Sequence, residues 1–261
     1  YMGWVGARWY FKQGAEAVTA WGRATIMRAI EIARSMGLRV IYGDTDSLFI
    51  GYVKGLAEEF AERISRELDM EIKIEKIYRK VFFTEAKKRY VGLTEDGRID
   101  IVGFEAVRGD WSELAKEIQE RVAEIVLRTE DISRAIDYVR GVIKDLEAGR
   151  ISIEKLVIWK TITRPLEEYE ATAPHVKAAK ILLSRGGRIA IGDKIGYVII
   201  RGAGRISDRA VPYIFADPKD IDPGYYIDHQ VIPAALRILE YFGVTEKTLR
   251  SGARSRSLFD Y

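Results

Sequence analysis

The sequence contains no cysteine, and only two of its 261 residues are histidines, His175 and His229. The absence of cysteine excludes disulfides, zinc fingers, cysteine-ligated iron–sulfur clusters and thiol nucleophiles. Two histidines leave little for a histidine-based metal site. The chemistry of this chain must therefore be sought in other residue types.

Long apolar runs and a strong net charge are also missing. No apolar run approaches the roughly 18 residues of a transmembrane helix, and no charged-then-apolar leader precedes the fold. Lys and Arg number 42 against 39 Asp and Glu, so the net charge of +3 gives no argument for nucleic-acid binding. With 48% hydrophobic and 31% charged residues, the composition is typical of a soluble globular protein with one large or two ordinary domains.

Two carboxylates, Asp44 and Asp46, lie in a tight turn within LRVIYGDTDSLFIGYV, residues 38–53. The flanking β-branched and apolar residues favour strands, and Gly43 with Asp44 favours a turn, so we expect a strand, a turn and a strand. Adjacent carboxylate oxygens suit Mg²⁺, which proteins hold through one or two carboxylates together with substrate phosphates. Phosphoryl transfer is the candidate chemistry, although a bare Asp-Thr-Asp also fits an ordinary solvated turn.

The first 109 residues have the pattern of an α+β domain. Apolar residues at helical spacing predict helices over 12–36 and 56–68. Alternating apolar residues predict strands over 71–83, 89–93 and 99–102, the last two paired across a Glu-Asp-Gly turn.

From residue 110 the pattern becomes mainly helical. Asp110 is the expected N-cap, with Glu113 at the capping-box position. We therefore place a domain boundary at 109–110. A short β insert around 195–201 interrupts the expected helices, which cover 111–128, 132–147, 174–185 and 225–242.

Several segments carry a resemblance to one family. Tyr42-Gly43-Asp44-Thr45-Asp46-Ser47 resembles the metal-binding hairpin of family B DNA polymerases. Further matching segments occur in the family's order and at similar spacing: YMGWVGARWY (1–10), AEAVTAWGR (15–23), KKRY (87–90), GFEAVRGDWSE (103–113) and ITRPLEEYEATAPHVKAAK (162–180). The chain resembles the C-terminal half of an archaeal-type enzyme. This implies the end of an antiparallel palm over 1–109, a mainly helical thumb over 110–250 and a tail over 251–261.

The resemblance implies nucleotidyl transfer from a dNTP to a primer 3′-hydroxyl with two Mg²⁺ ions. It makes Asp46 the principal metal ligand of the hairpin and gives Asp44 a supporting part. The family's other aspartate and its triphosphate-binding lysine belong to motifs that this sequence lacks. We therefore expect an N-terminal portion or a partner chain to complete the site, and this chain alone not to hold the two ions.

The resemblance also implies contacts with primer–template DNA. Lys87, Lys88, Arg89 and Tyr90 correspond to a motif that contacts the minor groove, where proteins read duplex shape with little base discrimination. Alone, such a tetrad fits a solvated basic patch. The other candidate contacts lie in three places. Arg108 is in the boundary segment, and Arg201 and Arg205 are in a Gly- and Arg-rich loop. Thr172, His175 and Lys177 are at the start of the helix over 174–185, where a helix N-terminus with nearby cations favours phosphate binding. For Arg108, a purely architectural joint fits equally well.

The C-terminal segment SGARSRSLFDY, 251–261, is basic and Ser-rich, for which disorder is the default. However, Leu258, Phe259 and Tyr261 resemble the apolar plug of a sliding-clamp binding peptide, although Ser255 stands where such peptides have Gln. Both interpretations stay open.

Three wider interpretations fit these features. The chain is a subunit of a split polymerase, a fragment of a longer polypeptide, as the non-initiator Tyr1 favours, or a non-catalytic DNA-binding or scaffold subunit derived from a family B polymerase. The intact Asp44, Asp46 and Lys88 argue against the last. The resemblance places the protein in a prokaryotic cytoplasm, at the nucleoid and with no membrane partner.

Overall fold

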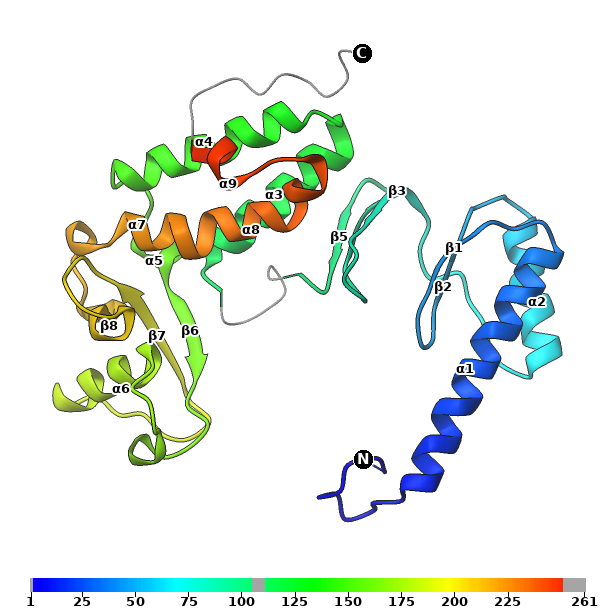
Figure 1. The fold of residues 1–261 in the computed structure, drawn as a ribbon, viewed down its shortest axis with the longest axis horizontal. Coiled ribbons are helices and arrows are strands. Elements are labelled where there is room, and N and C mark those ends of the chain that lie inside the picture. The colour runs from blue at the N-terminus through cyan, green and yellow to red at the C-terminus, as the bar shows by residue number, and fades with distance from the viewer. Residues whose placement is uncertain (1, 105–110, 251–261) are drawn as a thin grey trace. The chain divides into compact units, whose positions relative to one another are not determined.

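The structure, a computed structural model, describes residues 2–104 and 111–250 (Figure 1). It is α+β, as the sequence predicts, and divides into two compact units, Tyr1–Ile77 and Tyr78–Tyr261. We call these unit 1 and unit 2 and describe each by itself. The division into palm and thumb at 109–110 stays a prediction, because residues 105–110 lie outside the described part.

Unit 1 packs a two-stranded antiparallel hairpin against helices. Its elements are α1 (Lys12–Ser35), β1 (Val40–Gly43), β2 (Leu48–Ile50) and α2 (Leu56–Leu68). All four agree with the helices and the hairpin that the sequence predicts. The core joins the C-terminal half of α1 to α2 through Ile32, Ala33, Phe60 and Ile64.

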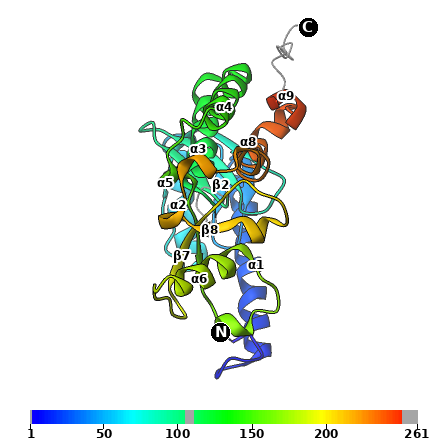
Figure 2. The same cartoon turned by 90° about the vertical axis from the view of Figure 1, so that its left-hand side faces the viewer.

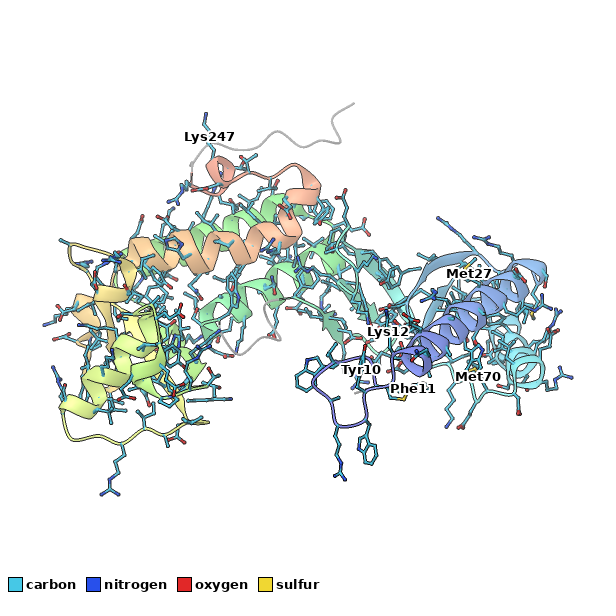
Figure 3. The ribbon with its side chains drawn as sticks, turned by 60° about the horizontal axis from the view of Figure 1, so that its bottom comes forward. Tyr10, Phe11, Lys12, Met27, Met70 and Lys247 are labelled. Carbon is cyan, nitrogen blue, oxygen red and sulfur yellow. The ribbon has the colours of Figure 1, made fainter. Side chains whose placement is uncertain are left out.

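Helix α1, up to Met27, and the segment before it leave apolar side chains exposed. Trp21 is 72% exposed and Met27 is 56% exposed, while the buried residues of α1 are Ala29, Ile32 and Ala33. Figure 3 labels Tyr10 and Phe11 just before α1 and Met27 farther along the helix. The helical spacing of apolar residues therefore predicts the helix correctly. However, Val18 and Trp21 of the apolar stripe are exposed and are not buried by the described residues of unit 1.

The strand expected over 71–83 is shorter than predicted. Strand β3 covers Tyr78–Phe83, and no strand is assigned to residues 71–77. Ile74 is 42% exposed. Alternation alone predicted the longer strand, but a strand also needs a hydrogen-bonded neighbour, and the strand that pairs with β3 ends opposite Tyr78.

Unit 2 begins with a three-stranded antiparallel sheet in the order β3-β4-β5. Strand β4 covers Tyr90–Thr94 and β5 covers Ile99–Val102, which confirms the predicted hairpin. Because side chains alternate between faces, Val91 and Leu93 of β4 enter the largest core of the unit, beside helix α3, while Tyr90 lies on the opposite face.

That core is formed mainly by helices. Besides α3 (Glu113–Thr129), they are α4 (Ile132–Glu147), α7 (Pro223–Tyr226), α8 (Ile232–Leu239) and α9 (Glu246–Arg250). Helix α3 begins at Glu113, and its N-cap is Ser112, whose hydroxyl accepts a hydrogen bond from the Ala115 amide at 3.3 Å. The prediction of Asp110 as N-cap is therefore wrong, because Ser112 supplies the cap one residue before the first helical turn.

The single helix expected over 225–242 is also wrong in detail. A π-helical turn, Ile227–Val231, separates α7 from α8, and a 3₁₀ turn, Glu240–Phe242, ends the run. Pro233 lies at the start of α8 and has no amide hydrogen to donate to the preceding turn. The backbone accommodates this missing hydrogen bond by widening before the proline.

A second sheet forms the β insert between α4 and α7. Its strands are β6 (Ile158–Thr161), β7 (Lys194–Ile199) and β8 (Ala210–Pro212), antiparallel in that order, where the sequence predicts only β7. Helix α6 (Pro174–Ser184) covers this sheet, as Figures 1 and 2 show, and shares a separate core with it. The short helices are α5 (Ile153–Leu156) and the 3₁₀ turns η2 (Leu166–Glu168), η3 (Ile206–Arg209), η4 (Tyr213–Phe215) and η5 (Pro218–Asp220).

Candidate active site and nucleic-acid interface

The carboxylates of unit 1 lie in the turn between β1 and β2. The Asp44 amide donates to the Ser47 carbonyl at 2.9 Å and closes the turn. The Thr45 amide and hydroxyl both donate to Asp44 Oδ1, at 2.7 and 3.2 Å. Asp44 therefore helps to build the turn through hydrogen bonds from the next residue, while Asp46 is exposed at its tip.

The two strands of this hairpin pack against α1 through Val40, Leu48 and Ile50. Gly43 pairs with Leu48, and a Cβ built on Gly43 would lie 3.3 Å from Leu48 Cδ1 and 3.8 Å from Ile30 Cδ1. Next to this pair, the rings of Tyr42 and Phe49 meet edge to face with centroids 5.9 Å apart. A two-stranded base packed on a helix gives the two carboxylates a defined support.

The donor set fits part of a magnesium site. Both side chains offer hard oxygen ligands, which Mg²⁺ prefers. One oxygen of Asp44 is engaged by Thr45, and Asp46 makes no hydrogen bond or ion pair with another residue that the structure describes. Over the described ranges, no three Asp, Glu, His or Cys side chains converge in a group that could hold a metal. The hairpin thus offers two carboxylates, fewer ligands than a complete magnesium site needs.

The basic tetrad of unit 2 spans the end of the loop between β3 and β4 and the first residue of β4, Tyr90. The loop is closed by Thr84, whose amide and hydroxyl donate to the Arg89 carbonyl at 3.2 and 3.3 Å. Lys87 and Lys88 are exposed in the turn, and Lys88 has a left-handed backbone with φ of 61°. Two cations are thereby presented at one end of the sheet.

Arg89 and Tyr90 follow at the start of β4 and are half-buried. The Arg89 Nε donates to the Gly103 carbonyl at 3.3 Å, and the guanidinium carbon lies 5.5 Å from the centre of the Phe104 ring. The Tyr90 ring meets that of Tyr78 edge to face at 6.3 Å.

The Tyr78 hydroxyl donates a hydrogen bond to Asp100 on β5. Burial of Tyr78 raises its pKa, and the hydrogen bond to Asp100 raises it further, so the phenol stays protonated and remains a donor. This hydroxyl links β3 to β5 across the face that carries Tyr90.

A second group of candidates surrounds the N-terminus of α6. Thr172 is exposed just before the helix, and Lys177 is half-buried in it. The His175 ring packs edge to face against Tyr169, with centroids 5.6 Å apart. Burial lowers the His175 pKa, and the nearby positive charge of Lys160 lowers it further, so this imidazole is neutral near pH 7.

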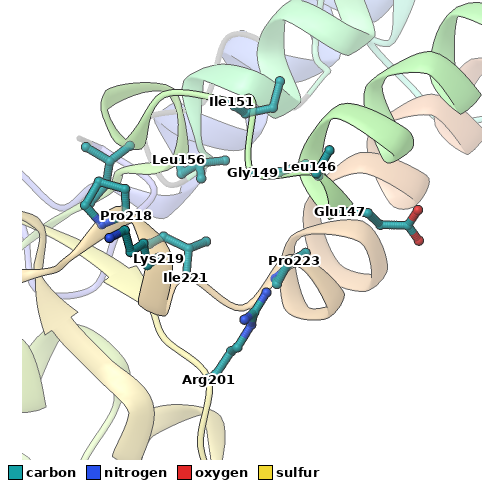
Figure 4. Close-up of a pocket in the computed structure, with 12 residues that line it drawn as sticks. Leu146, Glu147, Gly149, Ile151, Leu156, Arg201, Pro218, Lys219, Ile221 and Pro223 are labelled. Atoms are coloured by element: carbon teal, nitrogen blue, oxygen red, sulfur yellow. The ribbon is translucent and has the colours of Figure 1, made fainter.

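Arg201 and Arg205 lie in the loop after β7. Arg205 is exposed before η3, where its amide donates to Asp208 at 3.2 Å, and η3 packs on α6. The Arg201 side chain lies at a cavity of about 230 Å³ between the C-terminal end of α4 and the β insert, and points toward Pro223 (Figure 4). Most residues that line the cavity are apolar, and the charged ones are Glu147, Arg201 and Lys219.

The structure thus brings together Asp44 with Asp46, the members of the tetrad with one another, and Arg205 with the α6 group through η3. Arg108 and the tail residues Leu258, Phe259 and Tyr261 lie outside the described residues. Sequence reasoning did not single out Gly103 and Phe104 as contacts of the tetrad. The signal that points to them is their position at the start of GFEAVRGDWSE, 103–113, one of the segments that carry the family resemblance.

Comparison with protein families gives one match over most of the chain. The model of DNA polymerase family B matches residues 1–242. Among curated relatives, DNA polymerase 2 of Aeropyrum pernix is 57% identical over the whole chain, which covers 32% of that protein. A DNA polymerase of Archaeoglobus fulgidus is 42% identical over 97% of the chain and 35% of its own length.

Comparison with solved structures gives a similar result. The family B DNA polymerase of the hyperthermophilic archaeon Pyrobaculum calidifontis matches with a TM-score of 0.73 and 49% identity, covering 94% of this chain and 32% of that one. The chain therefore spans about a third of the length of these relatives. Within the described ranges, no helix is both long enough and apolar enough to cross a membrane.

Proposed function

Because this chain belongs to DNA polymerase family B, we propose that it is the C-terminal catalytic portion of a DNA-directed DNA polymerase, which transfers a nucleotidyl group from a dNTP to a primer 3′-hydroxyl. The observation that supports this most is the hairpin turn that presents Asp46 beside Asp44. An exposed carboxylate on a supported turn is available as a ligand, whereas a carboxylate in an ion pair would have to lose its partner first.

Asp46 and Asp44 would hold Mg²⁺ together with the triphosphate and further ligands. Bound in this way, two magnesium ions supply charge stabilisation for the attacking and leaving oxygens of an in-line displacement. The part of this chain is to fix the positions of the two carboxylates. The hydrogen bonds of Thr45 orient the Asp44 side chain, and the packing of Leu48 against the core residues of α1 holds the turn.

We also propose that the site is completed by an N-terminal portion or partner chain. The two carboxylates of the hairpin are short of a full ligand set. In addition, unit 1 exposes aromatic side chains, with Trp4 and Trp9 each 69% and Trp21 72% exposed. Monomeric proteins rarely leave large apolar surface in water, and an extended patch marks an interface. A further part of the polymerase that covers these side chains would be the source of the missing ligands.

Primer–template DNA is the proposed macromolecular substrate. Lys88, Arg89 and Tyr90 would follow the minor groove near the primer terminus, with Lys87 beside them, and the cations near α6 would contact the backbone. Such contacts give affinity without sequence specificity, which a template-directed copier requires. The tail residues Leu258, Phe259 and Tyr261 would engage a sliding clamp, and the enzyme would work at the nucleoid of a prokaryotic cell.

Reconstitution tests this proposal. The purified 261-residue chain should bind primer–template DNA weakly, with an affinity that falls as salt rises, and should incorporate no nucleotide. Joined to the N-terminal portion of the same polymerase, it should extend primers in the presence of Mg²⁺. Robust extension by the chain alone would refute the proposal that its active site is incomplete. Binding without any extension by the complete protein would favour the non-catalytic DNA-binding subunit instead.

A further inference from the structure

The loop that carries Lys88 and Arg89 rests directly on the backbone of Gly103. Gly103 has φ of 75°, and a Cβ built on it would lie 2.2 Å from the Lys88 carbonyl oxygen and 3.3 Å from Arg89 Cα. No real Cβ tolerates the first distance, and the atoms it would meet belong to backbone that cannot rotate away. Glycine is therefore required at 103 for two reasons, its conformation and the closeness of the loop.

Lys88 is itself in a left-handed conformation, which lysine seldom adopts. A non-glycine residue keeps such a backbone only where its surroundings fix it. Here the surroundings include the Gly103 backbone below the loop and the hydrogen bonds of Thr84 that close it. The direction in which the Lys88 side chain leaves the loop is thus set by the residues around it.

Phe104 extends this support to Arg89. The Phe104 side chain is 0% exposed in the core shared with β4 and α3. The Arg89 guanidinium lies over its ring, and Arg89 Nε donates to the Gly103 carbonyl. A cation over an aromatic face is attracted to it, and a planar guanidinium is also oriented by it. The Gly103 carbonyl and the Phe104 ring therefore both contact Arg89, and the Phe104 ring is itself fixed in the core.

We propose that Gly103 and Phe104 are positioning residues for DNA binding, which act by fixing Lys88 and Arg89 in the orientation in which these cations meet the primer–template. This inference rests on the proposed DNA contacts of Lys88 and Arg89. Long cationic side chains lose conformational freedom on binding, and fixing the loop beforehand reduces that loss. Gly103 and Phe104 touch no substrate themselves and act only through the loop.

Matched glycine variants separate this role from simple destabilisation. Gly103→Ala places a methyl group against the loop. Gly97→Ala is the control, because Gly97 also has positive φ, 84°, lies in the turn of the same sheet and has nothing within 4 Å of its built Cβ. Both variants strain the backbone, but only Gly103→Ala displaces Lys88. In the 261-residue chain, Gly103→Ala should weaken binding of a primer–template duplex on the order of tenfold, the effect of losing a hydrogen bond to a charged group. Gly97→Ala should bind as the parent does.

Phe104→Leu provides a second variant in case Gly103→Ala does not fold. It keeps an apolar side chain in the core and removes the ring beneath Arg89. Phe82→Leu is its control, because Phe82 packs against Tyr241 and Phe242, with centroids 5.4 and 5.6 Å away, and not against Arg89. Thermal unfolding should show both variants folded, and only Phe104→Leu should weaken DNA binding.

A double-mutant cycle tests the positioning role of Gly103 and Phe104 separately from the proposed DNA contacts of Lys88 and Arg89. In a Lys88→Ala, Arg89→Ala background, Gly103→Ala or Phe104→Leu should cause no further loss of affinity, because the residues on which they act are gone. An equal loss in both backgrounds would overturn the positioning role while leaving the DNA contacts intact. If the double alanine variant itself bound DNA as tightly as the parent, the proposed contacts of Lys88 and Arg89 would fail, and the positioning role with them.

Discussion

A hydroxyl group on helix α7 forms a hydrogen bond to the β insert of unit 2, and its removal should have a measurable cost. Tyr226, in α7, is 0% exposed, and its hydroxyl oxygen accepts a hydrogen bond from the Ile199 amide at the end of β7, at 3.2 Å. Ile199 is also fully buried. Tyr226→Phe keeps the ring and its packing but leaves this amide without an acceptor in a place that water does not reach.

The magnitude follows from what the substitution leaves behind. A buried donor without a partner costs about 1–3 kcal/mol, whereas the packing of the ring is unchanged. Burial raises the pKa of Tyr226, so its hydroxyl is neutral at all ordinary pH and no ionic contribution is lost. For a domain of 150–250 residues, each kcal/mol corresponds to roughly 2–4 °C in the unfolding midpoint. We therefore expect a lower free energy of unfolding and a midpoint reduced by several degrees.

Urea unfolding followed by circular dichroism measures the free energy, and hydrogen exchange at the Ile199 amide tests the hydrogen bond itself. Tyr241→Phe is the control, because the Tyr241 side chain is 39% exposed and its loss of a hydroxyl should change stability by less than about 0.5 kcal/mol. If Tyr226→Phe behaved like Tyr241→Phe, and the Ile199 amide exchanged no faster than in the parent, the proposed link between helices and insert would be refuted.

Other measurements test the remaining features. Burial lowers the His175 pKa below its ordinary value of about 6.5, so the unfolded chain binds this proton more tightly, and folding stability should fall as pH drops through about 6.5 toward the lower folded value. His175→Gln should lose less stability over that pH range, and equal pH dependence in both proteins would contradict the burial argument. If Lys177 and Arg205 contact DNA phosphates, Lys177→Ala and Arg205→Ala should each reduce the slope of log affinity against log salt by about 0.9; unchanged slopes would remove them from the interface. Deletion of Leu258–Tyr261 should leave synthesis on short templates unchanged and reduce clamp-stimulated synthesis on long ones. If a titration with clamp gave equal affinity for the intact and shortened enzymes, the tail would have no part in clamp binding.

The sequence predicted best those elements whose signals are local. Helix α2 has the predicted bounds, because its apolar spacing and the flanking Gly55 suffice to define it. The hairpin of β4 and β5 likewise follows from alternation and a Glu-Asp-Gly turn. In both cases the determining residues lie within a few positions of one another.

Errors arose where distant parts of the chain decide. The alternating run before Tyr78 forms no strand because no neighbour pairs with it, and nothing in its own residues shows this. The strands β6 and β8 escaped prediction because each is short and depends on pairing with β7, which is more than 30 residues away from β6.

The candidate site divides in the same way. The Asp44–Asp46 turn is a local motif, and the structure shows the strand-turn-strand that its sequence predicts. The contact of Gly103 with Lys88 joins the residue after β5 to the loop before β4, so only the folded sheet reveals it. The sequence did not predict that the first residues of the apolar stripe on α1, Val18 and Trp21, are exposed, because the periodicity of a helix shows that a face is apolar but not what covers it.

The most direct test of the proposed activity is single-turnover nucleotide incorporation by the complete polymerase carrying Asp46→Asn. Asparagine keeps the shape of the side chain and removes its charge, so the turn should persist while the ligand for Mg²⁺ is lost. Asp69→Asn is the control, because Asp69 is an exposed residue of unit 1 in a left-handed C-cap conformation that asparagine also adopts.

With the Asp46→Asn enzyme, incorporation should fall by about a thousandfold or more, since such a ligand stabilises transition-state charge by several kcal/mol. Affinity for primer–template should stay unchanged, and Asp44→Asn should cause a smaller loss. Near-normal incorporation by Asp46→Asn, with the Asp69→Asn control also active, would contradict the assignment of this hairpin as the metal-binding part of a polymerase active site.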